Sequence, residues 1–178
     1  SSSATLSFSE ENNAIPDCSN IIYAGLYWTG RAGTDEIFTV TNGTDTKEFD
    51  KRKVQLKKGI TGVYQDVVAT TTTDLNKNIY FPSGLDDNIY SAYAEITDYV
   101  VANGLGEYFV ADIATLEGDG GNSGYYGGWG MVVVYENSKM NWRDVTVFDG
   151  HAFVRREGAA GTSTNYTFDI DGFKTSEN

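Results

Sequence analysis

Alternation of apolar and polar residues restricts the fold of this chain more than any other feature. Between Ile22 and Trp28, the even positions hold Ile, Ala, Leu and Trp, whereas Tyr23 and Tyr27 occupy odd positions. Successive side chains of a strand point to opposite faces, so this run predicts a core face and a separate tyrosine-bearing face. Helical periodicity is almost absent from the chain. The sequence therefore predicts an all-β protein.

Other short runs in the chain also read as strands. Residues 131–135 are apolar at every position, which predicts a central strand that is covered on both faces. Twenty glycines separate the runs, and Asn42-Gly43, Asn103-Gly104 and Asp149-Gly150 predict turns. The remaining predicted strands cover residues 54–56, 63–69, 79–81, 89–96, 107–113, 143–148, 152–155 and 166–170.

One short helix is expected. Thr97 suits its N-cap, Asp98 its first turn, and Asn103-Gly104 its end. About ten short strands and one helical turn predict a two-sheet antiparallel sandwich, with a jelly roll as one topology that fits. No linker divides the chain, so residues 1–178 are expected to form a single domain.

The charge is strongly acidic. Thirteen Lys and Arg against 25 Asp and Glu give a net charge of −12, which repels phosphate backbones and anionic lipid surfaces. We therefore expect no nucleic-acid partner and, without an apolar run near 20 residues, no membrane insertion. The basic cluster Lys51-Arg52-Lys53 with Lys57-Lys58 is expected to form a solvated strand edge.

Acidic loops favour calcium as a structural cofactor. The carboxylates proposed as metal ligands are Asp86 and Asp87 in one turn and Glu117 and Asp119 in another, each with a neighbouring glycine. A third segment, 169–172, contains a short Asp-x-Asp-Gly element. The alternative explanation is that these carboxylates keep a surface protein soluble.

Catalytic constellations are scarce. The chain has one histidine, His151, one cysteine, Cys18, and no Gly-x-Ser-x-Gly sequence, so neither a triad nor a zinc cluster is marked. We expect no enzyme, and an unmarked pair of glycosidase carboxylates is the remaining catalytic alternative. Cys18 precedes a predicted strand and is expected to be a buried small hydrophobe.

A glycine-flanked aromatic segment spans residues 124–130. Tyr125 and Tyr126 could form a platform on which sugar rings stack, or could serve only the packing of the sheet. For Trp129 the structural explanation is preferred, since it begins the apolar run at 131–135. Trp28 and Trp129 are both predicted to be largely buried.

Four ordered motifs, at residues 23–28, 108–113, 127–136 and 143–150, resemble an uncharacterised β-rich domain found near the start of very large bacterial surface proteins. Such proteins in Bacteroidetes often end in gliding-motility or type IX secretion signals. In other bacteria, related domains precede arrays of adhesin-like repeats. The resemblance covers about residues 20–156 and departs at His151, where the family pattern has an aromatic residue.

The resemblance implies a secreted fragment of a larger protein at the bacterial cell surface, and it supplies no catalytic residues. The expected function is a non-catalytic adhesin or surface-assembly domain. Its partner would be a surface glycan, a protein ligand or another segment of the same surface protein. The alternative is a carbohydrate-binding module that uses Tyr125 and Tyr126.

Overall fold

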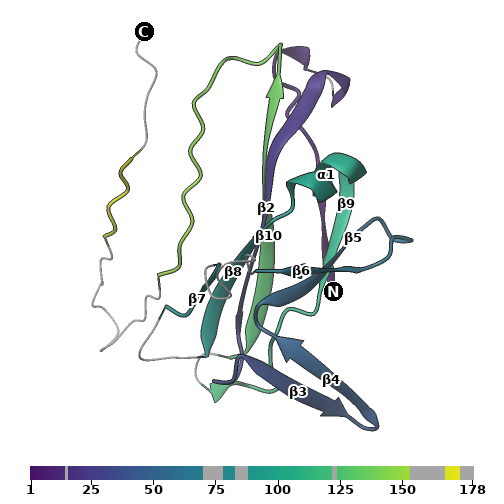
Figure 1. Ribbon diagram of the computed structural model, residues 1–178, viewed down its shortest axis with the longest axis vertical. Coiled ribbons are helices and arrows are strands. Elements are labelled where there is room, and N and C mark those ends of the chain that lie inside the picture. Colours follow the sequence, from purple (N-terminus) through teal and green to yellow (C-terminus); the bar gives the residue numbers. More distant parts are fainter. Residues whose placement is uncertain (15, 70–77, 83–87, 122–123, 153–166, 173–178) are drawn as a thin grey trace.

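The structure, a computed structural model, describes residues 1–14, 16–69, 78–82, 88–121, 124–152 and 167–172 (Figure 1). Its strands and helices in chain order are β1 (Ser2–Leu6), η1 (Glu11–Asn13), η2 (Pro16–Cys18), β2 (Ser19–Arg31), β3 (Ile37–Asn42), β4 (Asp45–Asp50), β5 (Lys53–Lys58), β6 (Gln65–Val68), β7 (Ile79–Tyr80), β8 (Ile89–Glu95), α1 (Thr97–Asn103), β9 (Gly106–Ala111) and β10 (Tyr126–Asn137).

Two four-stranded antiparallel sheets form the body of the protein. One has the strand order β1-β9-β5-β6 and the other has the order β10-β2-β8-β7. A separate hairpin, β3-β4, extends away from them (Figure 1). The prediction of an all-β sandwich is confirmed.

The core lies between the two sheets. The strand β2 supplies Ala24, Leu26 and Trp28, and the facing strands β5 and β9 supply Leu56 and Val110. These side chains follow the period of two that the sequence predicts, because only one face of each sheet turns inward. The burial of Trp28 is confirmed at 2% exposure, whereas Trp129 is partly buried and packs against the core.

The predicted inward face of β2 is wrong at Ile22, because the strand has a bulge there. Val134 pairs with Tyr23 and Tyr135 pairs with Ile21, so Ile22 is passed over in the ladder. An extra residue reverses the alternation at that point. Ile22, expected in the core, is therefore 56% exposed, and Ile21 packs against the core instead.

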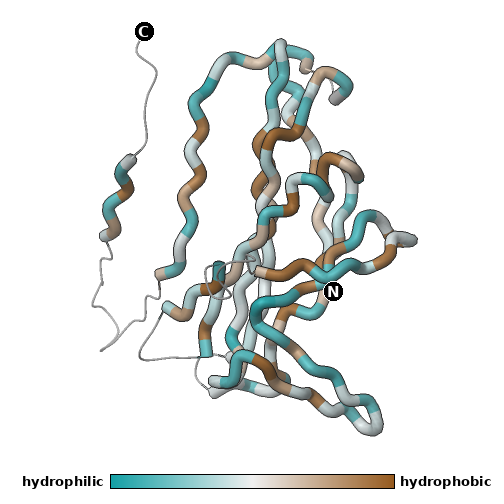
Figure 2. The backbone as a smooth tube through the Cα atoms, in the orientation of Figure 1, coloured by the Kyte–Doolittle hydropathy of each residue, from teal (hydrophilic) through white to brown (hydrophobic). Residues whose placement is uncertain are grey.

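The prediction that residues 131–135 form a central strand is wrong. They belong to β10, which lies at the edge of its sheet in the described part of the chain. The apolar residues on its outer side are approached by residues 141–150, which we call the strap. The strap runs beside the sheet as an extended segment (Figures 1 and 2).

The predicted strand at 143–148 is also wrong, because the strap joins no ladder among the described residues. Residues 167–170 are likewise without strand structure, while 153–155 and 166 lie outside the described residues. The structure adds β1 and the hairpin β3-β4, which the sequence patterns did not predict.

The predicted helix is confirmed as α1, although its cap differs from expectation. Ile96 occupies the N-cap position without a side-chain bond, and Thr97 lies inside the helix. The Thr97 hydroxyl oxygen accepts a hydrogen bond from the Ala24 amide at 3.0 Å, which ties the helix to β2. Gly104 ends the helix at φ 64°, in the left-handed region that favours glycine.

Two further predictions are corrected. The basic cluster does not form a strand edge, because β5 lies between β9 and β6, and Lys51 just before it is fully buried. Cys18, expected to be buried, is exposed at the end of η2. None of the helices in the described ranges is long and apolar enough to cross a membrane.

Candidate functional site

The outer face of the β10-β2-β8-β7 sheet carries the most distinctive group of side chains. Tyr27 on β2 lies opposite Tyr93 on β8 and Gly130 on β10. One step along, Thr29 lies opposite Ser91 and Gly128, and Ser91 lies opposite Tyr80 on β7. Paired residues of an antiparallel sheet share a face, so four strands together build this surface.

Three phenols form a hydrogen-bonded cluster here, which we call the tyrosine cluster. The hydroxyl oxygens of Tyr23 and Tyr27 lie 3.1 Å apart, and the Tyr23 hydroxyl donates to that of Tyr93 at 3.2 Å. The rings of Tyr27 and Tyr93 have centroids 4.9 Å apart and planes tilted by 32°. The cluster therefore presents a joined aromatic surface with fixed hydroxyl positions.

Gly25 makes the tyrosine cluster possible. A Cβ built on Gly25 would overlap the Tyr23 hydroxyl oxygen and approach Cε2 of Tyr27 and of Tyr93 at 3.0 Å. The Tyr23 side chain thus reaches its two partners across the bare backbone of Gly25, on the face away from the core. Only glycine leaves that space free.

The environment keeps these phenols neutral. Burial raises the pKa of Tyr23 from 10.0 to about 12, and it also raises the pKa of Tyr27 and of Tyr93. The charge of Asp149 on the strap raises the pKa of Tyr27 and Tyr93 further. At physiological pH the cluster therefore offers neutral hydroxyl groups.

Gly25→Ala is expected to lower the pKa of Tyr23 toward 10, because the new methyl group pushes the phenol out of the cluster into water. The raised pKa means that this group stabilises the fold below about pH 10 and that the contribution is lost as pH rises toward 12. Ultraviolet titration of phenolate absorbance measures the shift. Gly130→Ala, which adds a methyl group on the same face in open space, is the control.

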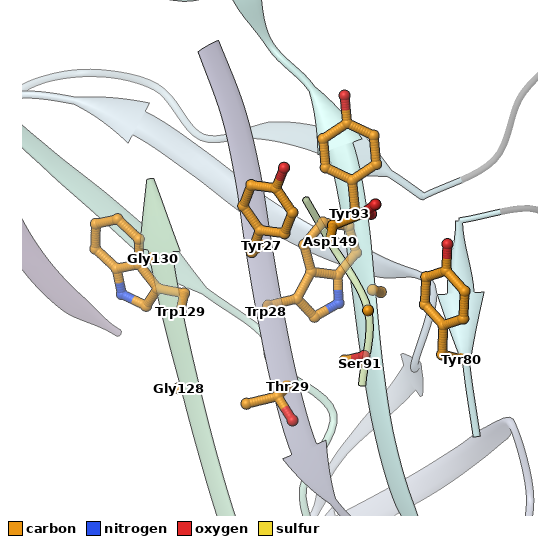
Figure 3. A pocket seen from close by; sticks show the side chains of 12 residues that line it. Tyr27, Trp28, Thr29, Tyr80, Ser91, Tyr93, Gly128, Trp129, Gly130 and Asp149 are labelled. Carbon is orange, nitrogen blue, oxygen red and sulfur yellow. The ribbon is translucent and has the colours of Figure 1, made fainter. Parts of the chain in front are cut away.

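An open groove of about 340 Å³ lies beside the tyrosine cluster (Figure 3). Its lining includes Tyr27, Tyr93 and Tyr80, from three neighbouring strands, together with Trp28 and Trp129. Gly128 and Gly130 form part of the floor, and a Cβ at either position would meet nothing within 4 Å. The floor is therefore bare backbone at the place where most strands would carry side chains.

The strap borders this groove. Asp149 and Gly150 line it, and Asp149 also reaches the neighbouring hollow of about 430 Å³. In that second hollow Val145 and Val147 of the strap face Val134 of β10. Alternate strap residues thus turn toward the sheet, which explains why the sequence of this segment looks like a strand.

The predicted ligand residues Tyr125 and Tyr126 do not line the groove. Tyr125 packs against Arg31, whose guanidinium carbon lies 5.5 Å from the ring centroid. Tyr126 pairs with Arg31 and, by alternation along β10, lies on the same face as Gly128. The ligand role of Tyr125 and Tyr126 therefore stays a prediction. The tyrosines that do line the groove were not proposed as ligand residues from the sequence.

The carboxylates proposed for calcium are only partly described. Asp86 and Asp87 lie outside the described residues, and Glu117 and Asp119 are both exposed at the surface. The Asp119 carboxylate accepts from the Gly121 amide at 3.0 Å. Among the residues that the structure describes, no group of three or more acidic, His or Cys residues is arranged for a metal ion.

A side chain already fills part of the second calcium loop. Arg31 Nη1 donates to the carbonyl oxygens of Gly120 and Gly124, at 2.8 and 2.9 Å. A calcium ion in this loop would draw on the same kind of backbone oxygen. The guanidinium thus supplies a positive charge where the sequence predicts an ion.

Calcium binding stays a prediction with a direct test. If an ion binds only the folded protein, millimolar Ca²⁺ should raise the thermal midpoint above that in EDTA, because binding adds about 2.7 kcal/mol to the free energy of unfolding at a hundred times the dissociation constant. Asp87→Asn and Asp119→Asn report which loop holds the ion. An identical midpoint in Ca²⁺ and EDTA for the unsubstituted protein contradicts the prediction.

Comparison of the chain with protein-family models, with curated proteins and with solved structures finds no match.

Proposed function

We propose that this chain is a non-catalytic binding domain of an exported bacterial surface protein, acting as an adhesin through the outer face of the β10-β2-β8-β7 sheet. The observation that carries the proposal is the open groove beside the tyrosine cluster. Soluble proteins rarely leave a fixed aromatic surface open to solvent without a ligand. The resemblance of the sequence motifs supports a surface location.

The lining of the groove favours binding over catalysis. Asp149 is the one carboxylate among the described lining residues, whereas glycoside hydrolysis uses a pair of carboxyl groups about 5–9.5 Å apart. No described histidine or cysteine lines the groove together with Asp149. Tyrosine, threonine and serine hydroxyls suit recognition of a ligand that stays unchanged.

Binding to surfaces tests this function. Labelled protein should bind saturably to at least one of intact bacterial cells, mucin or insoluble plant polysaccharide, without releasing new reducing ends. The double substitution of Tyr27 and Tyr93 by Ala should abolish binding. The control is Val101→Ala, because Val101 is an exposed apolar residue on α1, away from the groove. Turnover of a polysaccharide, or equal binding by the double variant, contradicts the proposal.

Surface assembly is the second candidate, and the edge strand β10 favours it. Its twelve residues include no Lys, Arg or Pro, which are the residues that usually protect a free sheet edge. A strand from another segment of a surface protein could add to it through backbone hydrogen bonds. Sedimentation should then show association that Val132→Lys weakens, and a strictly monomeric protein at all concentrations contradicts this candidate.

A further inference from the structure

We infer that the groove binds a neutral saccharide, with one sugar ring seated on the bare backbone of Gly128 and Gly130 beside Tyr27. The inference rests on the proposed binding function and names the class of ligand. It differs from the aromatic-loop hypothesis, because the residues come from β2, β7, β8 and β10 and from the strap rather than from Tyr125 and Tyr126.

The floor of the groove has the shape that a ring requires. Gly128 and Gly130 are alternate residues of β10, so both present the same outer face. A Cβ added at either position would have no atom within 4 Å, which leaves a flat hollow about two residues long. Tyr27 lies directly opposite Gly130 and forms the aromatic side of this hollow.

The lining contains partners for both kinds of group on a sugar, the apolar C–H faces and the hydroxyl groups. A sugar ring has apolar C–H faces, which pack on aromatic surfaces such as those of Tyr27 and Tyr93, and hydroxyl groups around its edge. Tyr80, Ser91 and the Asp149 carboxylate supply polar groups around the same hollow. A carboxylate accepts strong hydrogen bonds from hydroxyl donors.

The local charge selects against acidic ligands. Among the described residues that line the groove, none is Lys or Arg, and Asp149 is the sole charged group. Glu95 raises the pKa of Tyr93 through its charge and so adds to the negative field around the cluster. Phosphorylated, sulfated or uronic-acid ligands would be repelled, which removes acidic saccharides from the candidates, and a cationic ligand is the competing outcome of the test.

The test uses a panel of soluble oligosaccharides with the protein of residues 1–178. The neutral probes are cello-, xylo-, manno-, laminari- and malto-oligosaccharides. Polygalacturonate is the acidic probe, and choline is the cationic probe. We expect calorimetry to detect at least one neutral oligosaccharide, with neither polygalacturonate nor choline competing for its site.

Gly130→Val is the decisive substitution. A Cβ at this position meets no atom within 4 Å, so we expect the added side chain to fill the hollow while the fold is preserved. We expect at least a tenfold loss of affinity in Gly130→Val and about a tenfold loss in Tyr27→Ala. Tyr27→Phe should keep most of the affinity, because it keeps the ring. Val101→Ala, on α1 and outside the groove lining, is the control and should bind as the unsubstituted protein does.

Three results would overturn the inference: no neutral oligosaccharide binds at millimolar concentration, Gly130→Val binds normally while folded, or choline or polygalacturonate occupies the groove. The surface-binding experiment separates this failure from failure of the proposed function. Surface binding that Tyr27→Ala with Tyr93→Ala abolishes, without any oligosaccharide binding, leaves the adhesin function intact and removes the saccharide. If the protein binds neither surfaces nor oligosaccharides, the adhesin function and the saccharide ligand are both contradicted.

Discussion

Replacing Trp28 by Ala should lower the free energy of unfolding by about 3–5 kcal/mol, the largest single effect that we expect in this protein. The indole is 2% exposed between the two sheets, and its Nε1 donates to the Lys51 carbonyl oxygen at 3.0 Å. The substitution removes buried apolar surface, leaves a cavity and also leaves that carbonyl without this donor. Urea unfolding monitored by circular dichroism measures the loss.

The chain supplies its own control for this experiment. Trp142 on the strap is 89% exposed, so Trp142→Ala removes the same side chain with an expected change within about 0.5 kcal/mol. Trp28→Phe should fall between the two, because it keeps most of the volume and loses the hydrogen bond. If Trp28→Ala and Trp142→Ala cost the same, Trp28 is not part of a packed core between the sheets.

Local patterning predicted the sandwich because each face of a strand has one environment. The inward residues Ala24, Leu26 and Trp28 follow the alternation that the sequence shows. The pattern failed at Ile22, because a bulge depends on how the neighbouring strand pairs and not on the residues of one strand. The edge position of β10 could not be predicted for the same reason. An apolar run indicates that a strand is covered, but not whether a paired strand or another segment covers it.

The strap shows what alternation alone can and cannot predict. Val145, Val147 and Asp149 line the hollow beside the sheet, so alternate residues do share one side, yet Val145 is 59% and Val147 40% exposed and that side is not buried. A strand also needs a backbone partner, and among the described residues the strap has none in a ladder. Sequence periodicity predicts which residues of a segment share a side, whereas burial and strand pairing are decided by elements far away in the chain.

The candidate site was only half visible in the sequence. Tyr23 and Tyr27, on the odd positions of β2, were predicted to lie away from the core, and Gly25 between them was a signal that they could meet. Tyr93 joins them from β8, 66 residues beyond Tyr27, through a register that only the fold sets. The sequence pattern favoured Tyr125 and Tyr126 instead, because they are adjacent in the chain and flanked by glycine.

Lys51 carries the second large expected effect, and its position explains why the basic cluster is not a solvated edge. Its side chain is fully buried, and Nζ donates to the Gly33 carbonyl oxygen at 2.6 Å. The ring centroids of Phe81 and Tyr90 lie 5.5 and 5.7 Å from the same atom. A buried ammonium persists only where carbonyl oxygens and aromatic faces replace its water.

Lys51→Met should therefore cost about 1–3 kcal/mol of unfolding free energy, although methionine is apolar and of similar length. The cost comes from the hydrogen bond that the part-buried Gly33 carbonyl oxygen loses, and not from a cavity. Urea unfolding measures it, with Lys53→Met as the matched control. Lys53 is half-exposed and lies 3.5 Å from the Asp66 carboxylate, so its replacement should cost less than about 1 kcal/mol. If Lys51→Met is as stable as the unsubstituted protein, the ammonium is not needed at this position, because a purely apolar side chain then satisfies the core equally well.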